Sequence, residues 1–284
     1  MSKVAIVTDS TAYLPKELLE QYSITVVPQI LIWGEETFQD GVDIQPDEFY
    51  RRLKTAKVMP STSQVAIPTV KAAFEKLLEA GCEVLGIFLS AKLSGTMDSA
   101  IHAKALLPTA ADKIVTLDSN STAMAMGFHV MAAARAAQAG ASLAECQRVA
   151  EEAQKHTGVY FCVDTLEFLH RGGRIGGAQA MLGSALNLKP LLKLQDGRIE
   201  AVEKVRAKGK AIQRMIELVV EQAAGQTPVR LATLHANAED EARSALAAAA
   251  ARLQPVEQIL AAVSPAIGTH AGPGTVGLAY MAGM

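Results

Sequence analysis

Apolar positions in the first half of the chain alternate between short runs and longer stretches with a helical repeat. The run Val84 to Leu89 is typical of a buried strand. The stretch 69–80 before it repeats at the spacing i, i+3, i+4, i+7 and i+8 of a helix: Val70, Ala73, Phe74, Leu77 and Leu78. The same patterns predict strands at 4–7, 26–32 and 114–117, and helices after Pro15, after Asp47, at 99–107, near 124–132 and at 143–154. Strands alternating with helices predict a mainly parallel sheet with helices on both faces.

The second half has a different order of elements. Asp196-Gly197 separates two β-rich runs, 191–195 and 198–205, and is a strong hairpin signal. Further strands are predicted at 159–163, 230–234, 259–263 and 276–281, with helices at 208–224 and in the Ala-rich stretch 242–253. This order indicates an α+β domain. We therefore expect an α/β protein of two domains, residues 1–156 and 157–284.

Composition narrows the function classes. The 284 residues are 50% hydrophobic and 20% charged, as in a globular protein large enough for two domains. A net charge of −2 and only 5% aromatic residues argue against nucleic-acid binding. No apolar run reaches the roughly 18 residues of a membrane helix, so we expect no stable membrane insertion. The N-terminus, MSKVAIVTDS, lacks a signal-peptide pattern, which predicts a cytoplasmic protein.

Cysteine and histidine usage gives no sign of a metal or cofactor. The three cysteines form no CxxC pair, which argues against a disulfide scaffold or a zinc site and fits a reducing compartment. The six histidines show no ligand spacing such as HxxxH. Gly172 to Gly177, GGRIGG, matches neither a Walker loop nor the dinucleotide fingerprint and is interpreted as a turn presenting Arg174. We expect neither a metal nor a cofactor.

Ser94 lies between a predicted strand and a predicted helix, in the segment SAKLSGTMDSA. A nucleophile elbow has the pattern G-x-S-x-G, and here Lys92 and Thr96 occupy both glycine positions. At a helix start, Ser94 would instead lie at or near the N-cap, where the backbone N–H groups that follow, beginning with that of Gly95, can hold an anion. Three interpretations stay open: a plain N-cap, an anion site and a nucleophile.

Two more polar segments are candidates for ligand contact. The hydroxyl cluster STSQ, 61–64, either caps a turn or donates to an oxyanion. The glycine-rich segment GTHAGPG, 268–274, is predicted to be a tight loop that holds His270, either as a structural group or against a ligand. Asp9 ends the first strand, and Thr11 stands where a phosphoryl-accepting aspartate would have a second acid, so Asp9 is interpreted as a turn or cap residue.

The ordered set of these segments resembles the DegV family over nearly the whole chain. The matching segments are TDST (8–11), DG (40–41), STSQ (61–64), LSGT (93–96), DS (118–119), GRI (173–175), LKP (188–190), DG (196–197) and GTHAGPG (268–274). One position departs from the pattern, because the family often has proline after Ser-Gln and this chain has Val65. That difference affects the edge of a pocket and leaves the hydroxyl groups in place.

The resemblance implies a bacterial fatty-acid-binding protein with the acyl chain in a buried tunnel between two α/β domains. The family's carboxylate-binding positions correspond here to Thr62, Ser94 and His270, with Ser63 and Gly95 beside them. Neutral hydroxyls, backbone N–H groups and a histidine can hold a carboxylate and leave its oxygen reactive.

Several members of the family are the lipid-carrying subunit of fatty acid kinase. In that role the chain is not itself an enzyme: a separate ATP-dependent kinase subunit converts the bound acid to an acyl phosphate used in phospholipid metabolism. The resemblance assigns Arg174 and Arg206 to docking of that subunit. The alternatives are a serine acyl hydrolase or transferase that uses Ser94, His270 and an acid such as Asp118, and a binding module for another anionic ligand.

Overall fold

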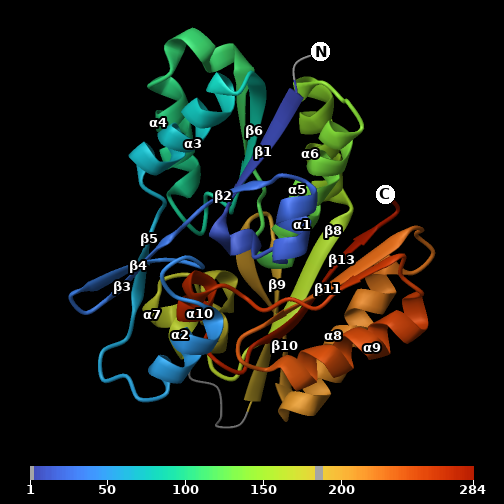
Figure 1. Cartoon of the computed structure of the whole chain (residues 1–284). Coiled ribbons are helices and arrows are strands. Elements are labelled where there is room, and N and C mark those ends of the chain that lie inside the picture. The colour runs from blue at the N-terminus through green and yellow to red at the C-terminus, as the bar shows by residue number, and fades with distance from the viewer. Residues whose placement is uncertain (1–2, 183–187) are drawn as a thin grey trace.

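The computed structural model describes residues 3–182 and 188–284, and its first half is built on a parallel sheet (Figure 1). The sheet has the strand order β2-β1-β6-β7. Its members are β1 (Lys3–Asp9), β2 (Thr25–Val27), β6 (Cys82–Phe88) and β7 (Ile114–Asp118), all parallel.

Helices cover both faces of this sheet, as predicted, because β6 alternates its side chains between two cores. Val84 and Phe88 belong to the core under α3 (Ile67–Glu79) and α4 (Thr96–Ala105), whereas Leu85 and Ile87 face α5 (Ala123–Gln138) and α6 (Leu143–Lys155). The short elements η1 (Ser10–Ala12), α1 (Lys16–Gln21) and η2 (Pro108–Lys113) lie in the connections.

The second half forms a mixed sheet with the strand order β10-β9-β8-β13-β11-β12. Its strands are β8 (Thr157–Cys162), β9 (Leu188–Gln195), β10 (Arg198–Arg206), β11 (Val229–His235), β12 (Glu257–Ile259) and β13 (Val276–Ala282). Only β11 and β12 pair in parallel among them. The predicted turn at Asp196-Gly197 joins β9 to β10, with positive φ at both residues. Helices α8 (Lys208–Ala223) and α9 (Glu239–Leu253) cover one face.

A third, small sheet corrects the predicted strand 26–32. Pro28 and Gln29 interrupt that run, so β2 ends at Val27 and a new strand, β3 (Ile30–Trp33), pairs with β4 (Glu36–Gln39) and β5 (Ser61–Ser63). This sheet and α2 (Pro46–Leu53) lie beside α7 (Glu167–Arg171) and α10 (Pro265–Ala271) of the second half (Figure 1). An excursion of the N-terminal half therefore reaches the C-terminal half.

Two predictions near the C-terminus were wrong in detail. The predicted strand 259–263 ends at Ile259 as β12, and only an isolated bridge at Ala262 continues it. The predicted loop 268–274 is helical in its first part, because α10 begins at Pro265 and is capped by the Ser264 hydroxyl, which accepts a bond from the Ile267 N–H. His270 therefore projects from a helix.

Helix α5 is the shared centre of the molecule. Every residue from Ala123 to Ala134 is buried, and the helix packs against β1 and β6 on one side and against β8, β11 and β13 on the other. A helix that is apolar all round is expected only where it is enclosed on all sides. The core of the two halves is therefore continuous at α5.

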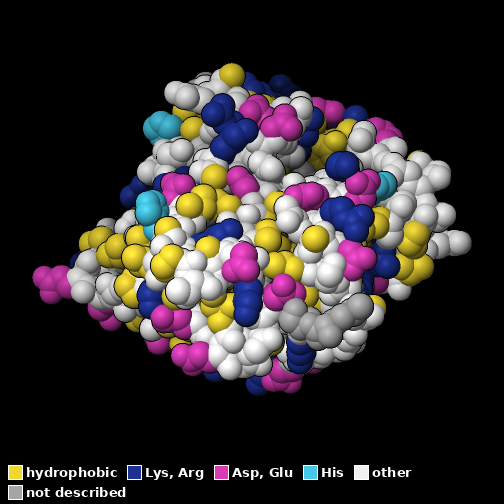
Figure 2. Space-filling view, turned by 90° about the horizontal axis from the view of Figure 1, so that it is seen from above, with side chains coloured by type: hydrophobic (Ala, Val, Ile, Leu, Met, Phe, Trp, Pro, Cys, Tyr) yellow, Lys and Arg dark blue, Asp and Glu magenta, His cyan; other side chains and the backbone are white. Residues whose placement is uncertain are grey.

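The surface has no strong charge pattern on the face seen from above in Figure 1. Figure 2 shows Lys and Arg side chains interspersed with Asp and Glu over this face, with hydrophobic side chains between them. In the described part of the chain, no helix is long and apolar enough to cross a membrane. The same residues contain no group of three His, Cys, Asp or Glu side chains arranged to hold a metal ion.

Candidate functional site

A cavity of about 250 Å³ lies where the two halves meet, at the carboxyl ends of β1 and β6. The chain crosses from β1 to β2 in one direction and to β6 in the other, so this is the switch point of the parallel sheet. Ligands of open α/β sheets bind at such points because the loops diverge and leave a crevice. Thr11 and Leu89, which follow these two strands, line the cavity.

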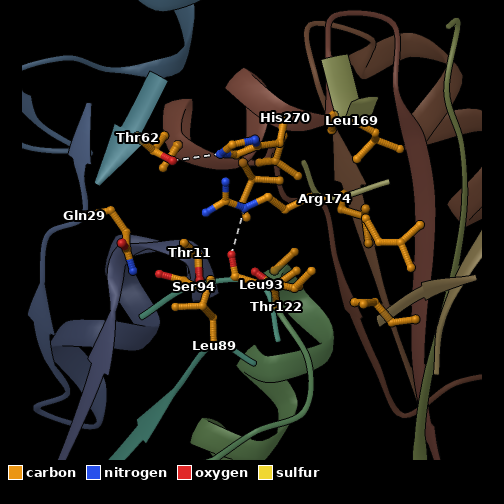
Figure 3. Close-up of a pocket in the computed structure, with 18 of the residues that line it drawn as sticks. Thr11, Gln29, Thr62, Leu89, Leu93, Ser94, Thr122, Leu169, Arg174 and His270 are labelled. Carbon is orange, nitrogen blue, oxygen red and sulfur yellow. Dashed lines mark hydrogen bonds between the residues drawn. The ribbon is translucent and has the colours of Figure 1, made fainter. Parts of the chain in front are cut away.

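One side of the cavity is polar and centres on Thr62 and His270 (Figure 3). The Thr62 hydroxyl and the His270 Nε2 are 2.7 Å apart, although β5 and α10 are separated by most of the chain. The other side of the imidazole packs closely against Gly172. A Cβ atom added at Gly172 would lie only 2.1 Å from His270 Nδ1. The ring is thus held between a hydroxyl and a glycine backbone.

The His270 imidazole is neutral at pH 7. Burial, followed by the positive charge of Arg174, lowers the pKa of His270 to about 4. A neutral imidazole carries one N–H and one acceptor nitrogen. Nδ1 is buried and has no hydrogen-bond partner among the described residues. A buried acceptor nitrogen without a partner costs less free energy than a buried N–H without one. The unpaired Nδ1 is therefore the nitrogen without the proton, and the favoured tautomer carries its proton on Nε2.

Ser94 belongs to a web of hydroxyl and amide groups on the other side of the Arg174 guanidinium from His270 (Figure 3). Its Oγ lies 3.1 Å from Thr96 Oγ1 and accepts a bond from the Thr96 N–H. Thr96 Oγ1 in turn exchanges bonds with the buried side-chain amide of Gln29. The N-cap of α4 is Gly95, and Ser94 is the residue before it, near the N-cap as predicted. The Ser94 side chain lines the cavity.

The described geometry does not favour a serine nucleophile. The hydrogen bonds of Ser94 run to Thr96, whereas His270 bonds Thr62, and no Ser94–His270 bond occurs among the described residues. The acid proposed for such a triad, Asp118, accepts bonds from the backbone N–H groups of Ala91 and Asn120. Its carboxylate is therefore used to shape two turns.

Ser63 and Gly95 also line the cavity, as predicted neighbours of the carboxylate site. Gly95 is packed so closely against Gln64 that an added Cβ would lie 2.0 Å from the Gln64 Oε1. Gln64 donates from its Nε2 to Ser99 Oγ on α4, so it ties β5 to that helix. The close approach explains why a glycine occupies this position.

Arg174, predicted only as a docking residue, lies in the cavity wall. Its Nε donates to the Leu93 carbonyl at 2.9 Å and its Nη1 to the Gly172 carbonyl at 2.6 Å. Figure 3 shows the guanidinium between His270 and Ser94. Sequence reasoning placed no arginine near Thr62, Ser94 and His270, and the structure adds a positive charge there. Arg206 is exposed at the end of β10, outside the cavity lining.

The rest of the lining is largely apolar and comes mostly from the second sheet. The side chains drawn toward that sheet in Figure 3 carry carbon only. The apolar lining residues from the second sheet are Val159 and Phe161 of β8, Leu194 of β9, Ile199 of β10 and Leu234 of β11. A concave site with an apolar wall and a few converging polar groups suits an amphiphile with one polar end.

Two buried carboxyl groups fix the backbone segments around the cavity by accepting hydrogen bonds from them. Asp9 caps η1 by accepting bonds from the Thr11 N–H and hydroxyl, and it also accepts the Leu89 N–H of the neighbouring strand. The interpretation of Asp9 as a cap is confirmed. Asp40 accepts the Ser10 hydroxyl and the backbone N–H of Ala266 in α10. It links the N-terminal half to the helix that carries His270.

Gln29, Asp40 and Arg174 are the site residues whose local role sequence reasoning missed. The signal for Gln29 was its position after Pro28 inside an otherwise apolar run, and the signal for Asp40 was its place in a family motif. Neither pattern states which distant group the side chain meets. In the folded chain, Gln29 meets Thr96 of α4 and Asp40 meets Ala266 of α10.

Known proteins resemble this chain over its whole length. A family model described as "Uncharacterised protein, DegV family" matches residues 3–283. A DegV domain-containing protein of Streptomyces coelicolor is 40% identical over 278 residues, which cover 97% of either chain. Among solved structures, one concerns fatty acid binding of a DegV family protein from Thermus thermophilus, with 32% identity, a TM-score of 0.92 and 99% of both chains covered. Another is DegV, a fatty acid binding protein from Bacillus subtilis, with 36% identity, a TM-score of 0.89 and coverage of 99% and 100%.

Proposed function

The chain belongs to the DegV family, and we propose that it binds a long-chain fatty acid, with the acyl chain in the cavity between the two sheets and the carboxylate at Thr62, Ser94 and His270. The observation that carries the proposal is the division of one cavity into a polar side and an apolar wall. Fatty acid binding by the Thermus thermophilus and Bacillus subtilis relatives supports the same ligand class.

The apolar wall accounts for most of the affinity. Burying about 14 methylenes contributes on the order of 11 kcal/mol before the costs of ordering the ligand, at roughly 0.8 kcal/mol each. A hydrogen bond to a charged head group adds roughly 1.5–3 kcal/mol. The head-group residues therefore serve mainly to place the carboxylate, and Ser94 holds the ligand by a hydrogen bond without forming a covalent bond to it.

The neutral imidazole gives the head-group site its polarity. With its proton on Nε2, His270 donates to Thr62 Oγ1 and leaves the Thr62 hydroxyl proton free to point into the cavity. The Ser94 hydroxyl lies on the other side of the Arg174 guanidinium from His270 (Figure 3), and Gly95 also lines the cavity. The carboxylate thus meets neutral donors, with Ser63 at the rim and the charge of Arg174 nearby.

Identification of the bound lipid tests this function. The purified protein is denatured, extracted and analysed by mass spectrometry, and stripped protein is then titrated with palmitate and oleate. We expect a co-purified fatty acid and saturable binding. Thr62→Ala and Ser94→Ala should each weaken binding about tenfold or more, since each removes a bond to a charged group. No bound acid and no response to either added acid would refute the function.

We also propose that the bound acid is presented to a separate ATP-dependent kinase subunit, which transfers a phosphoryl group to a carboxylate oxygen and forms an acyl phosphate. The proposed docking residues are Arg174 and Arg206. Arg174 contributes to the cavity wall as well, so its replacement alters lipid binding and docking together. Arg206 is the cleaner probe because it is exposed and lies outside the cavity lining.

A pair of arginines on one strand provides the docking test. Arg206→Ala should leave the affinity for palmitate unchanged and reduce acyl phosphate formation when the kinase subunit and ATP are added. Arg198→Ala removes an exposed arginine from the other end of β10 and is the matched control. Equal phosphorylation rates for the two variants would remove Arg206 from the docking surface.

A further inference from the structure

The hairpin between β9 and β10 ends against the loop that carries Ser94. We call its turn, Asp196-Gly197, the hairpin tip, and residues 90–95 the Ser94 loop. Ser90 is fully buried, and its hydroxyl donates to the Gly197 carbonyl at 2.8 Å. This bond joins residues 107 positions apart, so it connects the second half of the chain to the loop in front of α4.

Ser90 is the residue on which the Ser94 loop closes. Its carbonyl accepts the N–H groups of Leu93 and Ser94, at 2.9 and 3.1 Å. Its hydroxyl accepts the Lys92 N–H while it donates to the hairpin tip. A hydroxyl has one proton to donate and lone pairs to accept with, so both roles are filled at once. A direct backbone bond therefore makes the position of Ser94 depend on that of Ser90.

Two further bonds from the second half reach the Ser94 loop. Lys92 Nζ donates to the Asp196 carbonyl of the hairpin tip at 2.6 Å. The Arg174 Nε donates to the Leu93 carbonyl, as the dashed line in Figure 3 shows. The loop belongs to the first half of the chain, and the second half holds it at three successive points.

The hairpin tip approaches Ser90 so closely that only glycine fits there. Gly197 has a φ of +78°, and a Cβ added to it would lie 2.4 Å from Ser90 Oγ and 3.2 Å from Asn120 Oδ1. Any other residue would push the Ser90 side chain away from the tip. The contact between the two halves at this point is therefore tightly packed as well as hydrogen-bonded.

We propose that the hairpin tip positions the head-group site, and that Ser90 and Gly197 are positioning residues that act through Ser94. This inference rests on the proposed fatty-acid function. Ser94 comes from the first half and His270 from the second, so the space for a carboxylate depends on how the halves are joined beside it. Bonds to a charged group form at about 2.7–3.0 Å, and a displaced loop weakens them while the apolar wall stays intact.

A double-mutant cycle with Ser94 tests this role. Ser90→Ala removes the hydroxyl and keeps the backbone groups that close the loop. In the wild-type background it should weaken palmitate binding about fivefold to tenfold. In the Ser94→Ala background the same change should cost less than about twofold, because the group that it positions is absent. Calorimetric titration of the stripped proteins measures all four affinities, and thermal melts establish that each variant is folded.

Gly197→Ala disturbs the same contact from the side of the hairpin. It should reproduce the pattern of Ser90→Ala, with a loss of palmitate affinity that largely disappears in the Ser94→Ala background. Gly225→Ala is the matched control, because Gly225 has a φ of +75° and no atom within 4 Å of its Cβ position. It introduces the same backbone strain without pushing on a neighbour, and its palmitate affinity should equal that of the wild type.

Thr233→Val is the control for the loss of a buried hydroxyl. The Thr233 hydroxyl donates to the Ala261 carbonyl at 3.0 Å and accepts the Ala261 N–H at 2.8 Å, so it also joins two backbone segments. Both segments belong to the second half. Any change that this variant makes in palmitate affinity should be the same in the wild-type and Ser94→Ala backgrounds.

The outcomes distinguish this inference from the function on which it rests. Losses of equal size in the two backgrounds, for Ser90→Ala and for Gly197→Ala, would overturn the positioning role. Wild-type affinity in both of these variants would overturn it as well. Failure of the wild-type protein to bind palmitate would instead refute the proposed function.

Discussion

Gly172 supports the head-group site because it has no side chain. Its φ is −75°, which alanine adopts readily, so only the space around it is restrictive. An added Cβ would lie 2.1 Å from His270 Nδ1, well inside van der Waals contact. The imidazole would have to move away from Gly172 and toward Thr62 on its other side, so the hydrogen bond between His270 and Thr62 would be distorted or broken. A backbone position on α7 thus controls a side chain on α10.

We therefore expect Gly172→Ala to weaken fatty-acid binding by about tenfold, because Thr62 would no longer be held in position to donate its hydrogen bond to the charged carboxylate. Calorimetric titration with palmitate measures this. Gly209→Ala is the matched control, because no atom lies within 4 Å of the Cβ position there. Its position in α8 predicts a small gain in stability. Unchanged affinity in Gly172→Ala would show that the position of the imidazole does not affect binding of the head group.

At the residue level, the sequence indicated which polar residues are candidates for the site, and it did not indicate which distant groups their side chains contact. Thr62, Ser94 and His270, which were predicted as a group, all line one cavity, and their contact with a carboxylate stays a prediction. Arg174 was expected on a docking surface, and its bonds to two backbone carbonyls place it in the cavity wall. A turn sequence such as GGRIGG shows that a side chain is presented. The direction in which it points depends on Leu93, which is distant in sequence.

At the level of elements, the position of α10 depends on a buried acid from the opposite half. Asp40 is 1% exposed, and it accepts bonds from Ser10 and from the Ala266 N–H at the start of the helix. Burial raises the pKa of Asp40 to about 6; bonds from Ser10, Ser264 and Ala266 oppose this, and the charge of Asp9 adds to it. The folded state therefore favours the protonated carboxyl more than the unfolded chain does.

The sign of the pH effect follows from this shift. With the folded pKa above the unfolded value of 3.8, the stabilising contribution of Asp40 is complete below that value and is lost as pH rises through about 6. Relative to Asp40→Asn, which does not titrate, the wild type should lose about 2 kcal/mol of unfolding free energy between pH 4.5 and 7. Urea unfolding of both proteins across this range measures the difference.

Asp43→Asn serves as the matched control, since Asp43 is an exposed carboxyl three residues along the same loop. A pH-dependent difference of equal size in that variant would assign the effect to general surface charge. A flat difference between wild type and Asp40→Asn would show that Asp40 stays ionised in the folded protein throughout.

Elements were predictable where local pattern and tertiary contacts agree. The hairpin at Asp196-Gly197 was correct because both residues adopt the positive φ that this turn requires. The helix around His270 was missed because three glycines in 268–274 indicate a loop, while Pro265 and the Ser264 cap start a helix before them. A Cβ at Gly268 would lie 2.3 Å from the Tyr50 hydroxyl, so this glycine permits close packing against α2.

At the scale of the whole molecule, we propose the domain boundary near residue 156, between α6 and β8. The two sheets it separates are nevertheless joined through α5, which is buried against both. The small sheet β3-β4-β5 adds a second link by packing against α10. The cavity proposed to hold the fatty acid takes its polar side largely from the first half and its apolar wall largely from the second. The site therefore exists only while both halves keep their relative position.

This shared core predicts one cooperative unfolding transition that a fatty acid shifts as a unit. At a free palmitate concentration of about 100 times Kd, binding stabilises the folded state by about 2.7 kcal/mol. For a chain of this size that corresponds to a rise of about 5–10 °C in Tm. Butyrate has the same head group with almost no tail, so it should leave Tm unchanged at equal concentration. Scanning calorimetry that resolves two transitions, with palmitate moving only one of them, would show that the halves unfold independently and that α5 does not couple them.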